Sequence, residues 1–329
     1  MKKQIFKIAI IALVVLMLVP TVLSACGKKA QEIKIYALSG TTALGMAQMI
    51  DAAEKNTDDM NYQITLYSDP QVVANAVVSG ECAIAALPTN VAAKLYKKSE
   101  GKVQLLALNT LGVLYVLDTT GTVNTIADLK GKTVYVPGSG SNPEYITRAL
   151  LNGAGLNVGT DVFVDTDTYS SPDALQGALV EGQVEVAILP EPKVSAVTAS
   201  AQNVKVAIDL TAEWEKLYGE NTLVQGCLVV NKDFAEANPA KVKKFLEDYK
   251  ASVDFISAGS DEAITMIVEA GILPKAAIAK KALPNCNICC ITGDAMKAAI
   301  GVFYEKIFAL DPTSIGGSLP NDGIYYIAK

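Results

Sequence analysis

The chain has 329 residues, no histidine and a single arginine, Arg148. The absence of histidine excludes the Ser-His and Cys-His pairs of nucleophilic catalysis, and it excludes histidine-ligated metal sites. With one arginine, the chain cannot hold a carboxylate or a phosphate between several guanidinium groups. Catalytic classes that depend on these residues are therefore set aside.

Positive charge is also scarce, since the net charge is −6 and lysines are not clustered. Phosphate backbones are bound by clustered Lys and Arg, so no nucleic-acid partner is expected.

Cysteines are few and suggest no disulfide framework. Apart from Cys26 they number five, an odd count that fits poorly with the paired cysteines of small exported proteins. The sequence leaves open whether Cys286, Cys289 and Cys290 are paired or free. No metal or cofactor is expected, because a cysteine metal site here would need Cys82 and Cys227, which lie in apolar segments.

The N-terminus has the layout of a secretory signal. Three lysines occur in the first seven residues, and an apolar run follows over residues 8–22. The run is too short for a comfortable membrane span of about 20 apolar residues, and Pro20 interrupts it. Residues 1–25 are therefore predicted to be removed.

Residues 23–26, Leu-Ser-Ala-Cys, resemble the lipobox of bacterial lipoproteins. The resemblance implies that Cys26 carries a diacylglycerol and that cleavage follows Ala25. Residues 26–31 would then form a short polar tether at the extracytoplasmic face of the cell membrane. The alternative is an ordinary signal peptide with an incidental cysteine.

An internal repeat organises the rest of the chain. Residues 70–88 and 172–190 align at an offset of 102, with matching prolines at both ends and matching glycines at Gly80 and Gly182. Each copy alternates strands and helices, with first strands at residues 32–38 and 133–137. This pattern predicts two open α/β sheets, one per copy.

Two strand-like segments, residues 112–117 and 224–230, bracket the second copy. They suggest that the chain enters a second lobe, completes it and returns, which would make the crossings a hinge. We therefore predict a discontinuous lobe one, residues 32–116 and 226–329. Lobe two is predicted to span residues 117–225.

The predicted binding site lies where strands of the two sheets end, because ligands of open parallel sheets bind outside the carboxyl ends of the strands. Glycine turns there would let the backbone approach a ligand, and helix-start N–H groups would favour negative charge. The residues assigned to ligand binding are Ser39, Gly40, Thr41, Thr42, Tyr67, Thr89 and Asn90 in lobe one, and Ser139, Gly140, Ser141, Asn142, Tyr169 and Glu191 in lobe two.

Each of these residues also has an ordinary structural interpretation. The small polar turns can simply cap helices, and Tyr67 and Tyr169 can pack on the lobe edge instead of stacking on a ligand. Glu191 either faces a cationic group of the ligand or is an acidic loop residue exposed to solvent. Arg148 is expected to form an ion pair, on its own helix or across the hinge, and Trp214 is expected to pack in a core.

Four segments are similar to the substrate-binding lipoproteins of ABC importers, in the group for nitrate, sulfonate, taurine and thiamine-pyrimidine precursors. They are residues 127–132, 138–145, 189–192 and 314–320. The resemblance implies a two-lobed type II periplasmic-binding-protein-like fold and an ABC permease with its ATPase as partners. Residues 38–43 carry no charge, so a neutral or aromatic solute is expected at least as much as a small anion.

The leading hypothesis is thus a monomeric extracytoplasmic solute-binding lipoprotein that captures a small molecule between its lobes, and not an enzyme. An enzyme on the same fold is the alternative, and its acid or base would have to be Glu191, Asp69 or a tyrosine. A ligand-binding partner of a membrane sensor is a further alternative.

Overall fold

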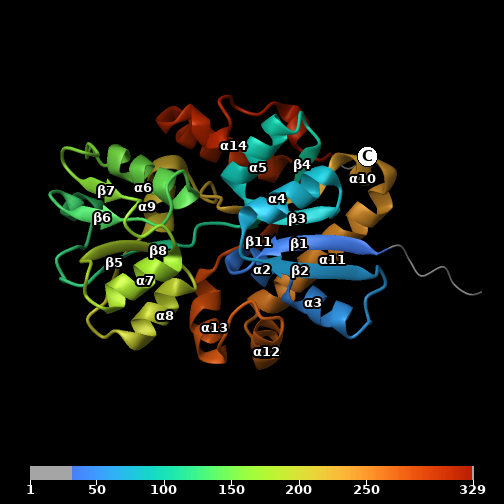
Figure 1. Ribbon diagram of the computed structural model, residues 1–329, viewed down its shortest axis with the longest axis horizontal. Coiled ribbons are helices and arrows are strands. Elements are labelled where there is room, and N and C mark those ends of the chain that lie inside the picture. The colour runs from blue at the N-terminus through green and yellow to red at the C-terminus, as the bar shows by residue number, and fades with distance from the viewer. Residues whose placement is uncertain (1–31, 328–329) are drawn as a thin grey trace, which may run out of the picture. The chain divides into compact units, whose positions relative to one another are not determined.

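The computed structural model describes residues 32–327 (Figure 1). The predicted signal peptide of residues 1–25, the lipidation site Cys26 and the tether of residues 26–31 lie outside the described residues. They therefore stay predictions.

Lobe one is built on a six-stranded sheet in the order β11-β4-β10-β3-β1-β2. Strands β1, β2 and β3 are parallel to one another, and β10 is antiparallel to both β3 and β4. The strands are β1 (Ile33–Leu38), β2 (Tyr62–Tyr67), β3 (Ile84–Pro88), β4 (Val103–Thr110), β10 (Gly226–Asn231) and β11 (Ile288–Ile291).

Lobe two is built on a five-stranded sheet in the order β7-β6-β8-β5-β9. Strand β5 is antiparallel to β8 and β9, while β6 is parallel to β7 and β8. The strands are β5 (Leu114–Asp118), β6 (Thr133–Tyr135), β7 (Phe163–Asp165), β8 (Val186–Pro190) and β9 (Lys205–Asp209). The prediction of an α/β protein with one sheet per copy is confirmed. Strands β10 and β11 run antiparallel to the others in the first sheet, and β5 does so in the second.

Helices surround both sheets (Figure 1). Lobe one has α2 (Thr41–Leu44), α3 (Ala47–Glu54), α4 (Pro70–Ser79), α5 (Thr89–Lys98), α10 (Lys232–Ala237), α11 (Pro239–Ser257), α12 (Asp261–Glu269), α13 (Ala276–Ala282) and α14 (Gly293–Leu310). Lobe two has α6 (Asn142–Gly153), α7 (Pro172–Val180), α8 (Lys193–Ser200) and α9 (Leu210–Tyr218). The 3-10 turns are η1 (Ile126–Leu129), η2 (Leu283–Asn285), η3 (Pro312–Ile315) and η4 (Asp322–Ile324). Within residues 32–327, no helix is long and apolar enough to cross a membrane.

The sequence repeat is also a structural repeat. Helices α4 and α7 both begin at a proline, and each is capped by the preceding side chain, Asp69 or Ser171, which accepts a bond from a helix N–H group. Both helices are followed by a glycine in the left-handed region, Gly80 at φ 78° and Gly182 at φ 73°.

The first turn of lobe one has no side-chain cap. Its N-cap is Gly40, which has φ 105° and no side chain to accept a bond. The helix that follows, α2, has only four residues. Thr42 instead donates its hydroxyl back to the Leu38 carbonyl oxygen over 2.9 Å.

The two crossings between the lobes lie close together. All of β5 pairs in the second sheet, beginning with Leu114 opposite Pro190. The first crossing therefore falls at residues 111–113, slightly before the predicted boundary of residues 116 and 117. The second crossing ends where β10 begins at Gly226, and the Gln225 Oε1 atom accepts a 2.7 Å bond from the Val113 N–H group, which ties the crossings together.

Three apolar clusters form the core. One lies within lobe one and one within lobe two, whereas the largest runs through both lobes. Trp214 of α9 is fully buried in this shared cluster, and its ring centroid lies 5.6 Å from that of Phe303 of α14. Trp214 is thus a packing residue, as expected.

Candidate functional site

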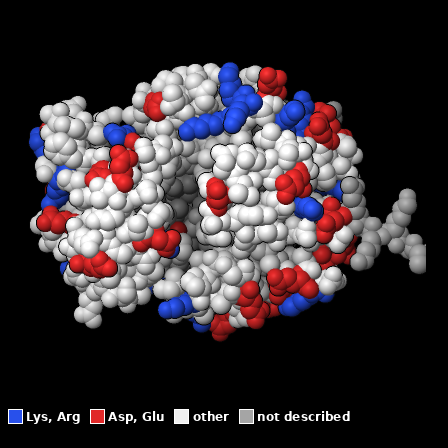
Figure 2. All heavy atoms as spheres, in the orientation of Figure 1, with Lys and Arg blue, Asp and Glu red and all other residues white. Residues whose placement is uncertain are grey.

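The predicted turns lie at matching places in the two lobes. Those of lobe one follow β1, β2 and β3, and those of lobe two follow β6, β7 and β8, so each set gathers at the carboxyl ends of parallel strands. Figure 2 shows the surface hollowed between the lobes, with mainly uncharged atoms in the hollow.

Four of the predicted residues meet across the lobes. The Asn90 amide donates to the Gly140 carbonyl oxygen over 3.2 Å. The Asn142 amide donates to the Thr89 hydroxyl over 3.0 Å and to the Gln225 carbonyl oxygen over 3.1 Å. Thr89, Asn90 and Asn142 are all buried, so the starts of α5 and α6 meet in a region largely shielded from solvent.

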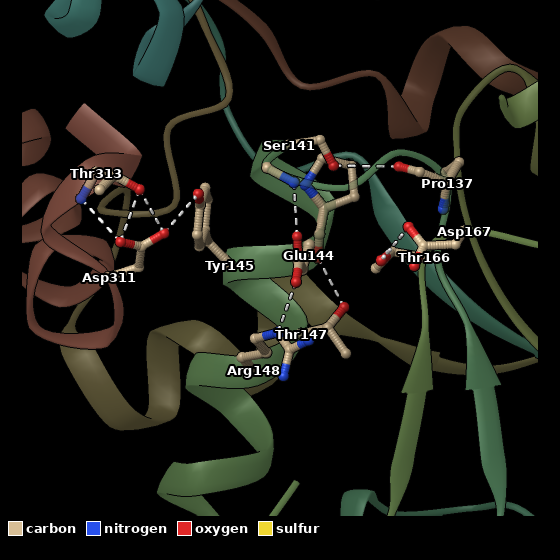
Figure 3. Close-up of polar contacts among 12 residues, drawn as sticks. Pro137, Ser141, Glu144, Tyr145, Thr147, Arg148, Thr166, Asp167, Asp311 and Thr313 are labelled. Atoms are coloured by element: carbon tan, nitrogen blue, oxygen red, sulfur yellow. Dashed lines mark hydrogen bonds and ion pairs between the residues drawn. The ribbon is translucent and has the colours of Figure 1, made fainter. Parts of the chain in front are cut away.

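The Gly140 turn of lobe two is held by its own helix (Figure 3). The Gly140 N–H group donates to Glu144 Oε2 over 2.7 Å, and Arg148 Nε donates to Glu144 Oε1 over 2.8 Å. The Ser141 hydroxyl donates to the Pro137 carbonyl oxygen over 3.1 Å. Arg148 therefore forms an ion pair on its own helix, and the Glu144 carboxylate offsets the positive end of the α6 dipole.

The first turn of lobe one is held by its neighbours. The Ser39 N–H group donates to the Tyr67 carbonyl oxygen over 2.8 Å, which brings two predicted turns together. The Asn109 amide donates to the Thr42 carbonyl oxygen over 3.0 Å. Ser39 and Ser139 are exposed, whereas Gly40, Thr41 and Thr42 are partly buried.

The two predicted tyrosines pack within their own lobes. The Tyr67 ring lies 4.8 Å from that of Tyr36, and the Tyr169 ring lies 5.7 Å from that of Tyr135. The Tyr169 hydroxyl also donates to Gln183 Oε1 over 3.2 Å. These contacts favour packing at the lobe edge over stacking on a ligand.

Glu191 is not the exposed loop acid that one interpretation expected, since its side chain is buried and only 3% of the residue is exposed. Its carboxylate accepts 3.0 Å bonds from the N–H group and the hydroxyl of Ser195, and a 3.4 Å bond from the Asn285 amide of lobe one. Burial raises the pKa of the Glu191 carboxyl, and the bonds from Ser195 oppose this. Glu191 thus contributes to a contact between the lobes.

Several site residues were missed in the sequence. Asn109 and Thr110 end β4, which runs in the same direction as β3, so their side chains lie at the same carboxyl edge as Thr89. Gln225 lies in the second crossing. A polar Asn-Thr pair directly after the apolar run of β4 was the available signal, but the repeat contains only the first three strands of each lobe.

A second contact region lies beside α6, where the Tyr145 hydroxyl donates to Asp311 Oδ2 over 3.1 Å (Figure 3). Burial, with help from Asp311, raises the pKa of Tyr145 to about 12. A polar cavity of about 710 Å³ lies here, lined by both lobes and including Lys94, Arg148 and Thr313. The cavity is lined by two acidic and two basic side chains, so it does not favour a ligand of one charge sign.

The cysteines carry no site chemistry in the part of the chain that is described. Cys82, Cys227, Cys286, Cys289 and Cys290 are free, and burial raises the pKa of each thiol. Between residues 32 and 327, no group of three His, Cys, Asp or Glu side chains is arranged to hold a metal ion.

Comparison with known families decides the classification. A family model described as NMT1/THI5 like matches residues 57–263, more than half of the chain. The chain belongs to the NMT1/THI5-like family. Among curated proteins, this family member is similar to a candidate binding protein of Brucella abortus, with 23% identity over 170 residues that cover 52% of this chain. It spans about half the length of the curated relatives it matches.

Solved structures share the fold of this NMT1/THI5-like chain. An ABC transporter structure from Parabacteroides distasonis matches with a TM-score of 0.76 and 24% identity, over 90% of this chain and 99% of that one. The periplasmic aliphatic sulphonate binding protein of Escherichia coli matches with a TM-score of 0.70 and 16% identity, over 91% and 92% of the chains. At these identities, the likeness establishes the two-lobed binding-protein fold.

Proposed function

We propose that this chain is an extracytoplasmic solute-binding lipoprotein that captures a small molecule between its lobes and delivers it to an ABC import permease. The observation that carries the proposal is the division of one polar site between two lobes, with the Asn142 amide of lobe two bonded to Thr89 and Gln225. A ligand that contacts both lobes would favour their closed arrangement, and a permease would recognise that state.

The family and the fold support this proposal, because the structural neighbours include transport and binding proteins. The ligand would contact the predicted turns of both lobes together with Asn109, Thr110 and Gln225. The protein would act as a monomer, with residues 33–111 and 226–327 as lobe one. Residues 114–222 would form lobe two.

The binding function is tested with the purified mature protein and a broad library of small solutes. A ligand at 100 times its dissociation constant stabilises the folded state by about 2.7 kcal/mol, which raises the melting temperature by about 4 °C for a chain of this size. Small-angle scattering should show a smaller radius of gyration with ligand. A library without any stabilising solute would contradict the proposal, and turnover of a bound solute would favour the enzyme alternative.

The lipid anchor is a separate part of the proposal, supported by the lipobox-like residues 23–26. Expression of the full-length protein in a bacterium fed labelled palmitate should label the protein and place it in the membrane fraction. Cys26→Ala should abolish both results, whereas Cys82→Ala, at a buried cysteine, should leave both unchanged. Label retained in Cys26→Ala would contradict the anchor.

A further inference from the structure

Four of the hydrogen-bond donors at the predicted turns are already used inside the protein. The Gly140 N–H group donates to Glu144, and the Ser141 hydroxyl donates to Pro137. The hydroxyls of Thr42 and Thr89 donate to the carbonyl oxygens of Leu38 and Val224. An oxyanion needs free donors, and these groups offer none.

The starts of α2 and α6 do not compensate for this loss. Helix α2 has four residues, too few for a useful dipole, and the carboxylate of Glu144 lies at the start of α6. A second negative charge brought to the Gly140 turn would be repelled by that carboxylate. Figure 3 shows Glu144 between Ser141 and Arg148.

Two amide oxygens and one hydroxyl, in contrast, are left without partners at the same edge. Asn109 Oδ1, Thr110 Oγ1 and Asn142 Oδ1 have no hydrogen-bond partner in the described chain. The three residues are 1%, 1% and 4% exposed. Buried polar atoms are usually paired, so a group of unpartnered ones at a predicted site calls for a ligand.

The orientation of both amides is fixed by their neighbours. The Asn109 Nδ2 atom faces the Thr42 carbonyl oxygen, and the Asn142 Nδ2 atom faces the Gln225 carbonyl oxygen. Turning either amide over would bring two oxygens together. The unpartnered atoms of Asn109 and Asn142 are therefore oxygens, which can only accept.

These atoms gather around one piece of backbone, residues 225–226. The Gln225 carbonyl oxygen holds Asn142, and a Cβ atom on Gly226 would lie 2.4 Å from Asn109 Oδ1 and 3.0 Å from Thr110 Oγ1. Gly226 leaves room for two polar side chains at the end of β4. The second crossing thus presents acceptors from both lobes in one place.

We propose that the site prefers a small neutral or cationic solute that presents N–H donors, such as an amide or an amino-heterocycle, to Asn109, Thr110 and Asn142 over an oxyanion. The inference rests on the proposed binding function and narrows its ligand class. It separates this chain from the sulphonate binding protein that shares its fold. A site built around buried acceptors discriminates strongly, because a ligand without donors leaves them unpaired.

The first experiment compares matched probes by thermal shift and calorimetry on the mature protein. Nicotinamide and benzamidine carry N–H donors, nicotinate and benzenesulfonate are their anionic counterparts, and nitrate and ethanesulfonate complete the anions. In each pair, the donor-bearing solute should bind at least tenfold more tightly than its anionic counterpart. Donor-bearing hits of the broad library should likewise bind at least tenfold more tightly than the anions. An oxyanion that binds as well or better would overturn the ligand class but leave the capture function standing. Failure of every solute would overturn both.

The second experiment removes one acceptor with Thr110→Val. Because the wild-type hydroxyl is buried and unpartnered, the ligand-free variant should melt no lower than wild type, while its affinity for the best donor-bearing solute should fall about tenfold. Thr110→Ser restores a hydroxyl and should restore affinity. Ser99→Ala is the matched control, since it removes another buried, unpartnered hydroxyl. Ser99 lies just after α5 and before the start of β4, at the sheet edge opposite the proposed site. Unchanged affinity in Thr110→Val would overturn the proposal.

Discussion

The two sides of the boundary between the lobes are built differently. On one side, α6 packs against α14, and Trp214 joins Phe303 in an apolar cluster that runs through both lobes. On the other side, α8 and α13 meet through polar groups. Lys281 Nζ donates to the Thr198 hydroxyl over 2.7 Å, and the Asn285 amide donates to Glu191 over 3.4 Å.

This difference suggests which contacts persist when the lobes move. Separating the apolar side would expose buried side chains at about 25 cal/mol per Å², whereas polar groups that separate exchange their partners for water at small net cost. We therefore expect the α6–α14 side to act as the fixed part of the hinge. The α8–α13 side would open. Four substitutions test this comparison.

The largest effect is expected for Trp214→Ala on the apolar side. Removing a fully buried tryptophan should lower the free energy of unfolding by about 3–5 kcal/mol, measured by urea denaturation. Leu217→Ala on the same helix is the control, and its exposed side chain should cost less than about 1 kcal/mol. Equal losses for the two variants would break the comparison.

Glu144→Ala should have the next largest effect. It leaves the partly buried Gly140 N–H group and the Arg148 guanidinium without their carboxylate, at a cost of about 1–3 kcal/mol in urea denaturation. Glu213→Ala removes another first-turn acid whose ion pair with Lys216 is exposed, and it should cost about 0–1 kcal/mol. If Glu144→Ala lowered the free energy of unfolding no more than Glu213→Ala does, the Gly140 turn would be held by other contacts.

Glu191→Gln tests the opposite side through its pH dependence. Because burial raises the folded-state pKa of Glu191 above its ordinary value of 4.5, the native protein binds this proton more tightly than the unfolded chain does. The stability that the protonated Glu191 contributes to the wild-type protein is therefore complete below pH 4.5, and it is lost as the pH rises through the folded-state pKa. Glu191→Gln cannot ionise, so its melting temperature relative to wild type should be higher at pH 7 than at pH 4. A relative melting temperature that is lower at pH 7 than at pH 4 would mean that the bonds from Ser195 lower the pKa of Glu191 more than burial raises it.

The smallest stability effect is expected for Lys281→Ala. The lysine is exposed, so the free energy of unfolding should change by less than about 0.5 kcal/mol. The ligand-free protein should nevertheless show a larger radius of gyration in small-angle scattering, because a contact between α8 and α13 is lost. Lys280→Ala is the control, since its partner Asp261 lies within lobe one. The same radius for both variants would argue against opening on this side.

Much of the fold could be predicted because local signals and the repeat agree. The prolines and glycines around residues 70–88 and 172–190 mark helix starts and ends by backbone geometry alone, and α4 and α7 follow them. The antiparallel strands β5 and β10 were recognised as crossings. Their places inside the two sheets depend on long-range pairing, which no local pattern encodes.

The candidate site was predicted in part. Thr89, Asn90, Gly140 and Asn142 meet as expected, because each follows a strand or begins a helix at the carboxyl edge. Asn109 and Gln225 reach the same edge from outside the repeat. Their position at this edge depends on the order of strands in the sheet, in which β10 lies between β4 and β3.

The sequence alone determined the absence of histidine chemistry and the duplicated α/β plan. These properties depend on composition and on local order along the chain. The tertiary structure decided which polar groups are free, because the partners of Gly140, Asn142 and Glu191 include residues far away in sequence. A hydrogen bond uses a donor or an acceptor only where both groups meet in space. The acceptor-rich character of the site is therefore a property of the folded chain.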